Sequence, residues 1–391
     1  MAAGHVFKKF VIYFKAIRIF TNFKKNANII VWNSYNSEYV IKILETNYST
    51  QLVEFSTKNI YIFFSIEFAY NFIKYLIYYK KIEYAYAAVI ISIFNPKLFI
   101  SYLSNTPFPK NISKDFSDIK LVSIQYAPES PNNMLYNYEY YFSWGNMSED
   151  LFHKYQAQYK KIYKIGSLKL ATLNSINHTI NNKLVFISTY RTMYHMLDFK
   201  GYSNLEKQEL YQITLCLNDL LEKSKILLKK LLDRNFEIAV AMANTDKSCY
   251  EKENEINFYN SISKKILQVP KIGLSSYSVC KDSDITITIN SSLGFELIAI
   301  GKKVIFLIDE KEFLDISLQP WGKENLLYQN IPNFLRSSFN EKVLINKIDF
   351  LKSLDNNKYI EMTEEFRKYY CLSPNNTIEL FNKHINEIIN T

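Results

Sequence analysis

Short apolar runs alternate with longer amphipathic stretches along most of the chain, beginning with ANIIVW at residues 27–32. The apolar runs have the length of β-strands, and the stretches between them have the length of helices. The expected strands are 27–32, 51–56, 97–102, 120–127, 140–145, 161–167, 183–189, 236–243, 265–270 and 285–289. The expected helices are 37–46, 148–159, 204–231, 255–265 and 377–390, with two more inside the Tyr-rich region 59–94. Strands at this spacing, separated by helices, predict βαβ units and parallel sheets.

A polar stretch, LNSINHTINN at 173–182, interrupts this alternation, which then restarts. A chain of 391 residues is also too long for one ordinary core and fits two domains of roughly 150–200 residues each. We therefore expect an N-terminal domain over 28–175 and a C-terminal domain over 183–370. A basic segment, 1–27, precedes them, and a C-terminal helix over 371–391 packs on one of the two halves.

Composition excludes several classes of protein. Lys, Asn or Tyr interrupts every long apolar run, so no segment predicts a membrane span. The cysteines lack CxxC spacing, which predicts neither a zinc site nor a disulfide framework and fits a reducing cytoplasm. The histidines do not cluster either, so we expect no metal site. These residues are Cys216, Cys249, Cys280, Cys371, His5, His153, His178, His195 and His384.

The net charge of +9 is concentrated at the N-terminus. Residues 1–27 contain six Lys or Arg residues and no acid, interleaved with Phe and Ile. A basic segment rich in Phe can lie on an anionic membrane surface. The alternative is an ordinary amphipathic element packed on the first domain. The cations sit at one end and no nucleic-acid-binding module is recognisable, so nucleic acid is not an expected partner.

The stretch ITITINSSLGFELIAIGKKVIFL at 285–307 carries the most specific chemistry. A buried strand at 285–289 runs into Ser291 and Ser292, which we expect to be the loop and N-cap of a helix. The N–H groups and positive dipole of a helix start, beside hydroxyls, can bind phosphate. Gly294 would let a ligand approach the backbone, and Glu296, one turn inside, would accept hydrogen bonds from sugar hydroxyls. The alternative is that Ser292 only caps the helix and Glu296 only favours its dipole.

The order of these segments resembles the GT-B glycosyltransferases of surface-carbohydrate and capsule assembly. Residues 282–307 are similar to the donor-site segment of those families. Residues 140–169, which precede the linker, and 183–191, KLVFISTYR, resemble two further segments in the same order. The resemblance implies an α/β fold of two Rossmann-like domains facing a central cleft. It also implies that Ser291, Ser292 and Gly294 hold the donor phosphate.

By the same resemblance, Glu296 holds the ribose or donor sugar, and the loop 188–191 faces the same cleft. That loop contains Thr189 and Arg191, and Arg191 could neutralise the phosphate of the leaving nucleotide. A surface ion pair is the alternative role for Arg191. Residues 274–280, LSSYSVC, are expected to form the nucleotide-base loop, with Ser276 and Tyr277 near the ring. The alternative for Tyr277 is a place in the core.

Two departures from the family pattern bear on mechanism. Gln125 remains from a Gln-His-Gly motif whose His and Gly are absent. The second glutamate of the retaining motif is also absent, since Lys303 and Val304 occupy that region, and this favours inversion. Inverting transfer needs a base near the acceptor hydroxyl. Glu38 and Glu129 are the candidates, although exposed loop glutamates are usually only solvated.

The sequence thus predicts a cytoplasmic glycosyltransferase, peripheral on the inner face of the membrane, with a nucleotide-sugar donor and a glycan or lipid-linked acceptor. It is expected to need neither cofactor nor metal. Two alternatives stay open. One is a nucleotide-sugar epimerase of the same fold. The other is a membrane-surface glycan-binding protein whose transferase site has decayed.

Overall fold

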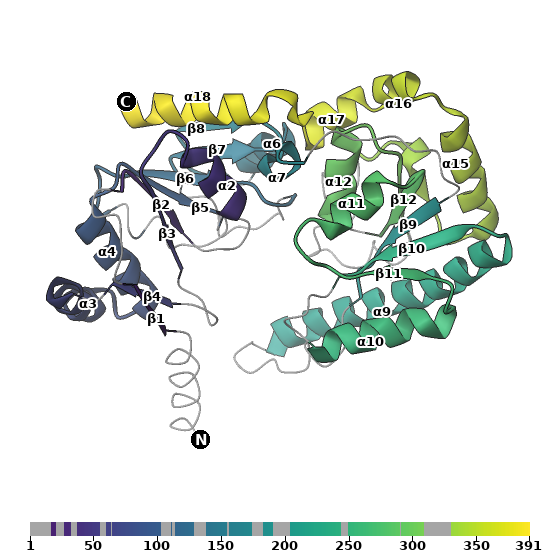
Figure 1. Ribbon diagram of the computed structural model, residues 1–391, viewed down its shortest axis with the longest axis horizontal. Coiled ribbons are helices and arrows are strands. Elements are labelled where there is room, and N and C mark those ends of the chain that lie inside the picture. Colours follow the sequence, from purple (N-terminus) through teal and green to yellow (C-terminus); the bar gives the residue numbers. More distant parts are fainter. Residues whose placement is uncertain are drawn as a thin grey trace. The chain divides into compact units, whose positions relative to one another are not determined.

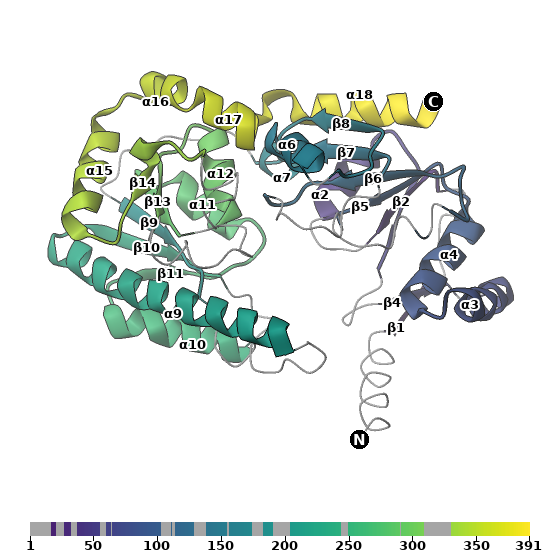
Figure 2. The same ribbon diagram turned by 180° about the vertical axis from the view of Figure 1, so that it is seen from behind.

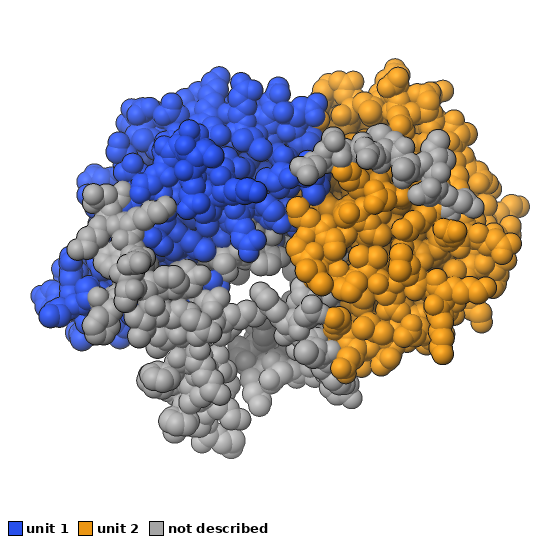
Figure 3. Space-filling view, in the orientation of Figure 1, with its two compact units in different colours: residues 1–173, 374–391 blue, residues 174–373 orange. Residues whose placement is uncertain are grey.

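The computed structural model describes residues 17–20, 27–32, 37–54, 60–63, 65–102, 111, 114–128, 138–154, 156–173, 183–190, 204–243, 249–289, 291–308 and 330–391. Glu129, Arg191 and most of the basic segment 1–27 lie outside these residues. The chain forms two compact units (Figure 3). Unit 1 comprises 1–173 and 374–391, and unit 2 comprises 174–373.

Unit 1 is built on a six-stranded sheet in the order β3-β2-β5-β6-β7-β8, and all its neighbouring strands are parallel. The inner strands β2, β5, β6 and β7 are short and mostly buried, as expected for a parallel sheet that is covered on both faces, whereas the edge strand β8 is partly exposed. Their bounds are β2 Ile29–Trp32, β3 Thr50–Val53, β5 Leu98–Ser101, β6 Lys120–Ile124, β7 Tyr140–Ser143 and β8 Lys161–Lys164. The connecting helices include α2 Ser37–Leu44, α6 Met147–Lys154 and α7 Leu168–Ala171.

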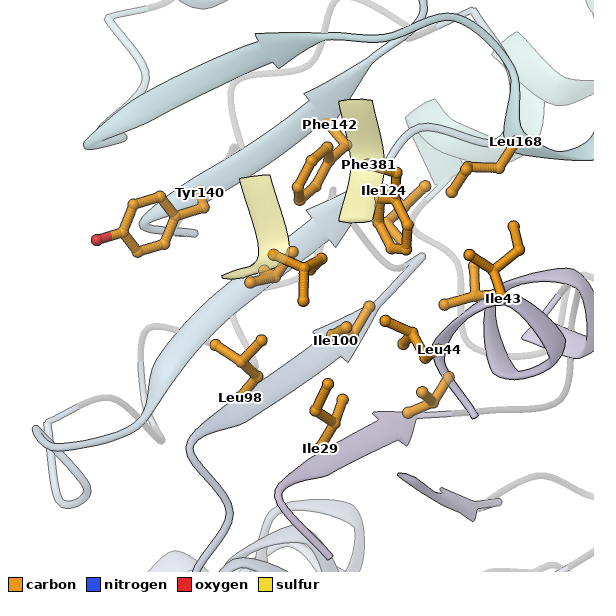
Figure 4. Packing of buried hydrophobic residues seen from close by; sticks show 14 of the residues in the cluster. Ile29, Ile43, Leu44, Leu98, Ile100, Ile124, Tyr140, Phe142, Leu168 and Phe381 are labelled. Atoms are coloured by element: carbon orange, nitrogen blue, oxygen red, sulfur yellow. The ribbon is translucent and has the colours of Figure 1, made fainter. Parts of the chain in front are cut away.

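The C-terminal helix α18, Thr377–Asn390, belongs to unit 1 and covers one face of this sheet. Its apolar residues Phe381, Ile385 and Ile388 are fully buried in a cluster with residues of β2, β5, β6 and β7 (Figure 4). The rings of Phe381 and Phe142 meet edge to face, with 4.9 Å between centroids. The Thr377 hydroxyl also donates to the Ile165 carbonyl. The last helix is therefore a component of the first core.

The Tyr-rich region 59–94 contains a strand as well as the two expected helices. β4, Ile60–Phe63, pairs in parallel with β1, Ile17–Phe20, and α3, Ile66–Tyr79, and α4, Ile82–Phe94, follow. α4 is buried along most of its length, whereas α3 lies outside it, away from the six-stranded sheet (Figure 1).

Unit 2 contains a second parallel six-stranded sheet, in the order β11-β10-β9-β12-β13-β14. Its strands are β9 Lys183–Ile187, β10 Glu237–Ala241, β11 Leu267–Val269, β12 Ile285–Thr288, β13 Val304–Leu307 and β14 Arg336–Ser337. Its helices are α9 Asn204–Asp233, α10 Cys249–Ile262, α11 Ser275–Lys281, α12 Ser292–Ala299, α15 Glu341–Ser353, α16 Asn356–Met362 and α17 Glu364–Tyr370. The chain adds β10 and β11 on one side of β9, then returns to add β12 and β13 on the other side.

The predicted α/β fold of two Rossmann-like units is confirmed. The linker was expected at 173–182, and unit 2 begins at Asn174. The sequence leaves open which half the C-terminal helix packs on, and the structure includes it in unit 1 from Pro374 onward. The cleft expected between the two domains stays a prediction.

Candidate functional site at the carboxyl edge of the second sheet

The strand order of unit 2 creates a switch point between β9 and β12, where the connections leave the sheet in opposite directions. β9 and β12 are directly paired, with Thr288 opposite Ile187, so both strands end at the same edge. Ligands of open α/β sheets bind at the carboxyl ends of the strands beside such a point. The segments that leave these ends contain Thr189 and Ser291, both predicted site residues.

The turn after β12 is built from side-chain hydroxyls. The Ser291 N–H donates to Thr288 Oγ1 at 3.1 Å, which closes the turn. Ser291 Oγ then accepts from the Leu293 N–H at 3.3 Å and caps α12. The cap is therefore Ser291 rather than Ser292, which is the first helical residue. Both serines are partly exposed, so a ligand can reach the positive end of this helix.

Gly294 has a packing reason to be glycine. A Cβ at this position would lie 3.0 Å from Thr288 Cγ2 and 3.1 Å from a Phe306 ring carbon. The backbone N–H of Gly294 donates to the Ser291 carbonyl at 3.0 Å. The absent side chain lets α12 pack closely on β12 and β13. A role of this backbone in donor binding stays a prediction.

Glu296 and Tyr277, predicted separately, lie in contact. The Tyr277 hydroxyl donates to Glu296 Oε2 at 2.5 Å, and the two side chains are only 5% and 2% exposed. A carboxylate has about four acceptor positions, so this bond does not exhaust Glu296. Residues 275–281 form the helix α11 rather than the expected base-binding loop. Tyr277 is buried, and Ser276 is the partly exposed member of the pair.

A buried carboxylate that the sequence did not reveal joins the ends of β9 and β10. Glu255 of α10 is fully buried and accepts from the Ser188 hydroxyl at 2.5 Å and from the Ala243 N–H at 2.8 Å. Ser188 Oγ also accepts from the Tyr259 hydroxyl at 2.9 Å and from the Tyr190 N–H at 3.1 Å. Burial raises the pKa of Tyr259, which keeps its hydroxyl protonated as a donor. This network fixes the backbone on either side of Thr189.

The predicted residues of unit 1 have different environments. Glu38 is exposed in the first turn of α2, just after β2, rather than in a loop. Gln125 is 3% exposed, and its Oε1 accepts from the backbone N–H of Trp144 at 2.6 Å and from the Ser148 hydroxyl at 3.1 Å. Gln125 therefore holds β6, β7 and α6 together. Within the described part of the chain, no group of three His, Cys, Asp or Glu side chains could hold a metal ion.

Two Rossmann-like units, the second with a hydroxyl-lined helix start at its switch point, define the GT-B class of fold. Solved structures of similar fold support this class. The MnaA–UDP co-structure from S. aureus shares 11% identity over 93% of this chain and 96% of that chain, with a TM-score of 0.54. The H548A variant of the wall teichoic acid polymerase TagF shares 15% identity with this chain, and the match covers 93% of this chain and 89% of that chain with a TM-score of 0.51. A glycosyltransferase from Rickettsia africae shares 13% identity with this chain, and the match covers 93% of this chain and 99% of that chain with a TM-score of 0.50.

A family model described as "putative O-antigen biosynthesis protein" matches residues 125–381, and the chain belongs to this family. The match includes all of the described switch-point residues in unit 2. The predicted resemblance to surface-carbohydrate families of this fold is thereby confirmed. No match is found among curated proteins. In the described residues, no helix has both the length and the apolar character needed to cross a bilayer.

Proposed function

We propose that the protein is a glycosyltransferase that moves a sugar from a nucleotide-sugar donor to a surface glycan or a lipid-linked acceptor. The observation that carries the proposal is the hydroxyl-lined start of α12 at the β9–β12 switch point. The family match supports the glycan context, because surface polysaccharides are assembled by sugar transfer. The similar MnaA structure contains UDP, so UDP-sugars are the first donors to test.

The proposed donor site lies wholly in unit 2. Ser291 and Ser292, with the N-terminal backbone of α12 through Gly294, hold the donor phosphate at the positive end of the helix dipole. Thr189 approaches from the neighbouring strand end. Arg191 follows it in the chain and supplies a cation for the leaving nucleotide.

The nucleoside end of the donor lies beside α11 in this proposal. Glu296 accepts a hydrogen bond from a ribose or sugar hydroxyl, while Tyr277 holds the carboxylate in place. Ser276, which is partly exposed, contacts the base.

The proposed reaction is inverting and independent of metal. A carboxylate of unit 1, Glu38 or Glu129, takes the proton of the acceptor hydroxyl as its oxygen attacks the anomeric carbon, and the nucleotide leaves with the electron pair of the broken bond. Glu38 has the exposure that this role requires. Val304, which occupies the region of the second glutamate in retaining relatives, is fully buried in β13.

The acceptor suggests the location. A lipid-linked or growing surface glycan is found at a membrane, and the six cations of residues 1–27 would attract the protein to an anionic surface. We therefore propose a cytoplasmic protein that is peripheral on the inner face of the membrane.

The variant Ser292→Asp tests the phosphate site. Aspartate in the first turn suits the helix dipole, so α12 should keep its stability, while its charge repels the donor phosphate. We expect UDP-, GDP- or CMP-sugars to raise the melting temperature of the wild type but not of this variant. Asn356→Asp adds the same charge to the first turn of α16 and serves as the matched control.

The outcomes separate the alternatives. If no donor shifts the melting temperature of the wild type, or if Ser292→Asp responds like the wild type, the proposed site is wrong. A donor that binds and is converted to a different sugar without any acceptor would identify the epimerase instead. Donor binding without turnover, with every acceptor fraction, would favour the decayed glycan-binding protein.

A further inference from the structure

Helix α3 presents apolar side chains on two opposite faces. Its inner face contacts a core cluster of unit 1 through Phe68, Phe72, Tyr75 and Tyr79. Its outer face consists of Ile66, Tyr70, Ile73 and Ile77, whose exposed fractions are 91%, 69%, 60% and 73%. We refer to these four residues as the outer face of α3. A surface helix normally carries polar residues opposite its buried stripe, so this face departs from the ordinary pattern.

The outer face is one continuous stripe. Its residues follow each other at intervals of four, three and four positions, which places them on the same side of a helix. Tyr78 and Ile82, 65% and 48% exposed, extend the apolar surface toward the turn between α3 and α4. Figures 1 and 2 show α3 outermost in this part of unit 1, with α4 between it and the sheet. Grouped exposed apolar side chains of this kind mark a surface that binds something.

Three lysines and three acids lie around the stripe, and one of the acids is Glu83 in the first turn of α4, beside Ile82. Lys74, Lys80 and Lys81 are all exposed, on the helix and at its C-terminal end. The exposed acid of α3 is Glu67 in the first turn, where it suits the helix dipole. Asp115 lies near the other end, and it accepts from the Tyr79 hydroxyl at 2.5 Å and from the Tyr78 hydroxyl at 3.3 Å. Apolar residues flanked by lysines are the pattern of a helix lying in a membrane interface.

The strand that precedes α3 pairs with a strand from the N-terminal part of the chain. β1 pairs in register with β4, with Arg18 opposite Tyr61, and α3 begins three residues after β4 ends. β1 belongs to residues 1–27, which contain six cations and no acid. Among the described residues, β1 contributes one of these cations, Arg18.

We infer that the outer face of α3 docks on an anionic lipid bilayer, with its isoleucines among the acyl chains and the lysines among the headgroups. Each lysine near an anionic surface adds attraction, and burial of the isoleucines adds the hydrophobic contribution. A second copy of this chain is the alternative occupant, and the test below distinguishes it from a bilayer. The inference deepens the membrane attachment proposed above. It does not depend on sugar transfer, and it is tested without a donor.

The test is flotation of the full-length protein with phosphatidylcholine vesicles, with and without phosphatidylglycerol. The variant Ile73→Glu/Ile77→Glu puts two charges on the outer face while keeping good helix formers there. Ile226→Glu/Ile272→Glu is the matched control, because these unit 2 isoleucines are exposed to a similar degree, 59% and 62%. Circular dichroism and the melting temperature show whether both variants stay folded.

We expect the wild type and the control to bind the anionic vesicles and the α3 variant to bind at least roughly tenfold more weakly. Lys74→Gln/Lys80→Gln/Lys81→Gln should weaken binding to anionic vesicles and reduce its salt dependence. Equal vesicle binding by the wild type and the folded α3 variant would overturn the inference and leave residues 1–27 as the attachment. A wild-type dimer that the α3 variant converts to a monomer, with vesicle binding unchanged, would instead assign the face to a second copy.

Discussion

The hydrogen bond between the Tyr277 hydroxyl and Glu296 joins α11 to α12 inside unit 2. A carboxylate that is 2% exposed is costly to bury unless hydrogen-bond donors surround it. A residue needed only to cap or charge the helix start would lie at the surface, as Glu38 does in α2. Glu296 lies one turn inside α12 from the partly exposed serines, which is the position that the proposed donor contact requires.

Substitution of Glu296 distinguishes this donor contact from a purely structural role. Glu296→Ala leaves the buried Tyr277 hydroxyl without its acceptor and should lower the free energy of unfolding by about 1–3 kcal/mol. Glu296→Gln keeps the size and an acceptor oxygen, so its stability should stay close to that of the wild type. Loss of a charged acceptor for the donor hydroxyl should lower kcat/KM for transfer by roughly 10- to 100-fold.

Tyr277→Phe is the control for that comparison. It removes the internal hydrogen bond but leaves the carboxylate, so transfer should persist at a level well above that of Glu296→Gln. Urea denaturation and steady-state transfer assays give the two quantities. If the folded Glu296→Gln variant turns over like the wild type, Glu296 is a structural residue and the donor contact is wrong.

At the scale of elements, Glu255 connects α10 to the carboxyl ends of β9 and β10. The hydrogen bonds from the Ser188 hydroxyl and the Ala243 N–H both end on the same oxygen of Glu255, Oε1. The segments it holds follow the strands at the edge where the candidate site lies. A preorganised binding site requires rigid strand ends, because ligand binding then costs less free energy for ordering the surrounding loop.

Glu255→Leu and Glu255→Gln make a matched pair for this network. Leucine removes the acceptor of the Ser188 hydroxyl and of the Ala243 N–H, and should destabilise unit 2 by about 2–4 kcal/mol. Glutamine retains an acceptor oxygen and should recover most of that loss. Urea denaturation measures both variants. Equal stabilities of the leucine and glutamine variants would show that Oε1 does not hold these strand ends.

The sequence allowed prediction of most elements, since strands buried on both faces are continuous apolar runs such as ITIT of β12. It did not reveal β4, because its residues IYIF continue directly into the apolar pattern of α3. The sequence predicts a loop where α11 forms, because this helix is short and begins with two serines. The turn at Ser291 could be predicted, because two adjacent serines follow the apolar run 285–289 in the sequence. Glu255 had no such local signal, because its partner Ser188 is 67 positions away in the chain.

At the scale of the whole molecule, each unit has its own core, and the core of unit 1 combines segments from both ends of the chain. Phe381 of α18 and Ile348 of α15 are both fully buried, the first in unit 1 and the second in unit 2. Proteins with two cores often unfold in more than one step. The equilibrium unfolding of this chain should therefore contain two transitions.

Paired core substitutions would assign those transitions. Phe381→Ala should lower the stability of unit 1 by about 3–5 kcal/mol, and Ile348→Ala that of unit 2 by about 2–5 kcal/mol. Calorimetry of the two variants should show a different transition moving in each case. A single transition that both substitutions shift equally would contradict independent cores.

The return of α18 to unit 1 has a consequence for the order of assembly on the ribosome. The strands of the first sheet are complete once Lys164 has been made, but the helix that covers their apolar face follows only after the approximately 200 residues of unit 2. At a synthesis rate of about 5–20 residues per second, the apolar face of the first sheet stays uncovered by α18 for roughly 10–40 seconds. Unit 2, which is continuous in the chain, is synthesised in that interval. The nascent first half is therefore the part that would engage a chaperone.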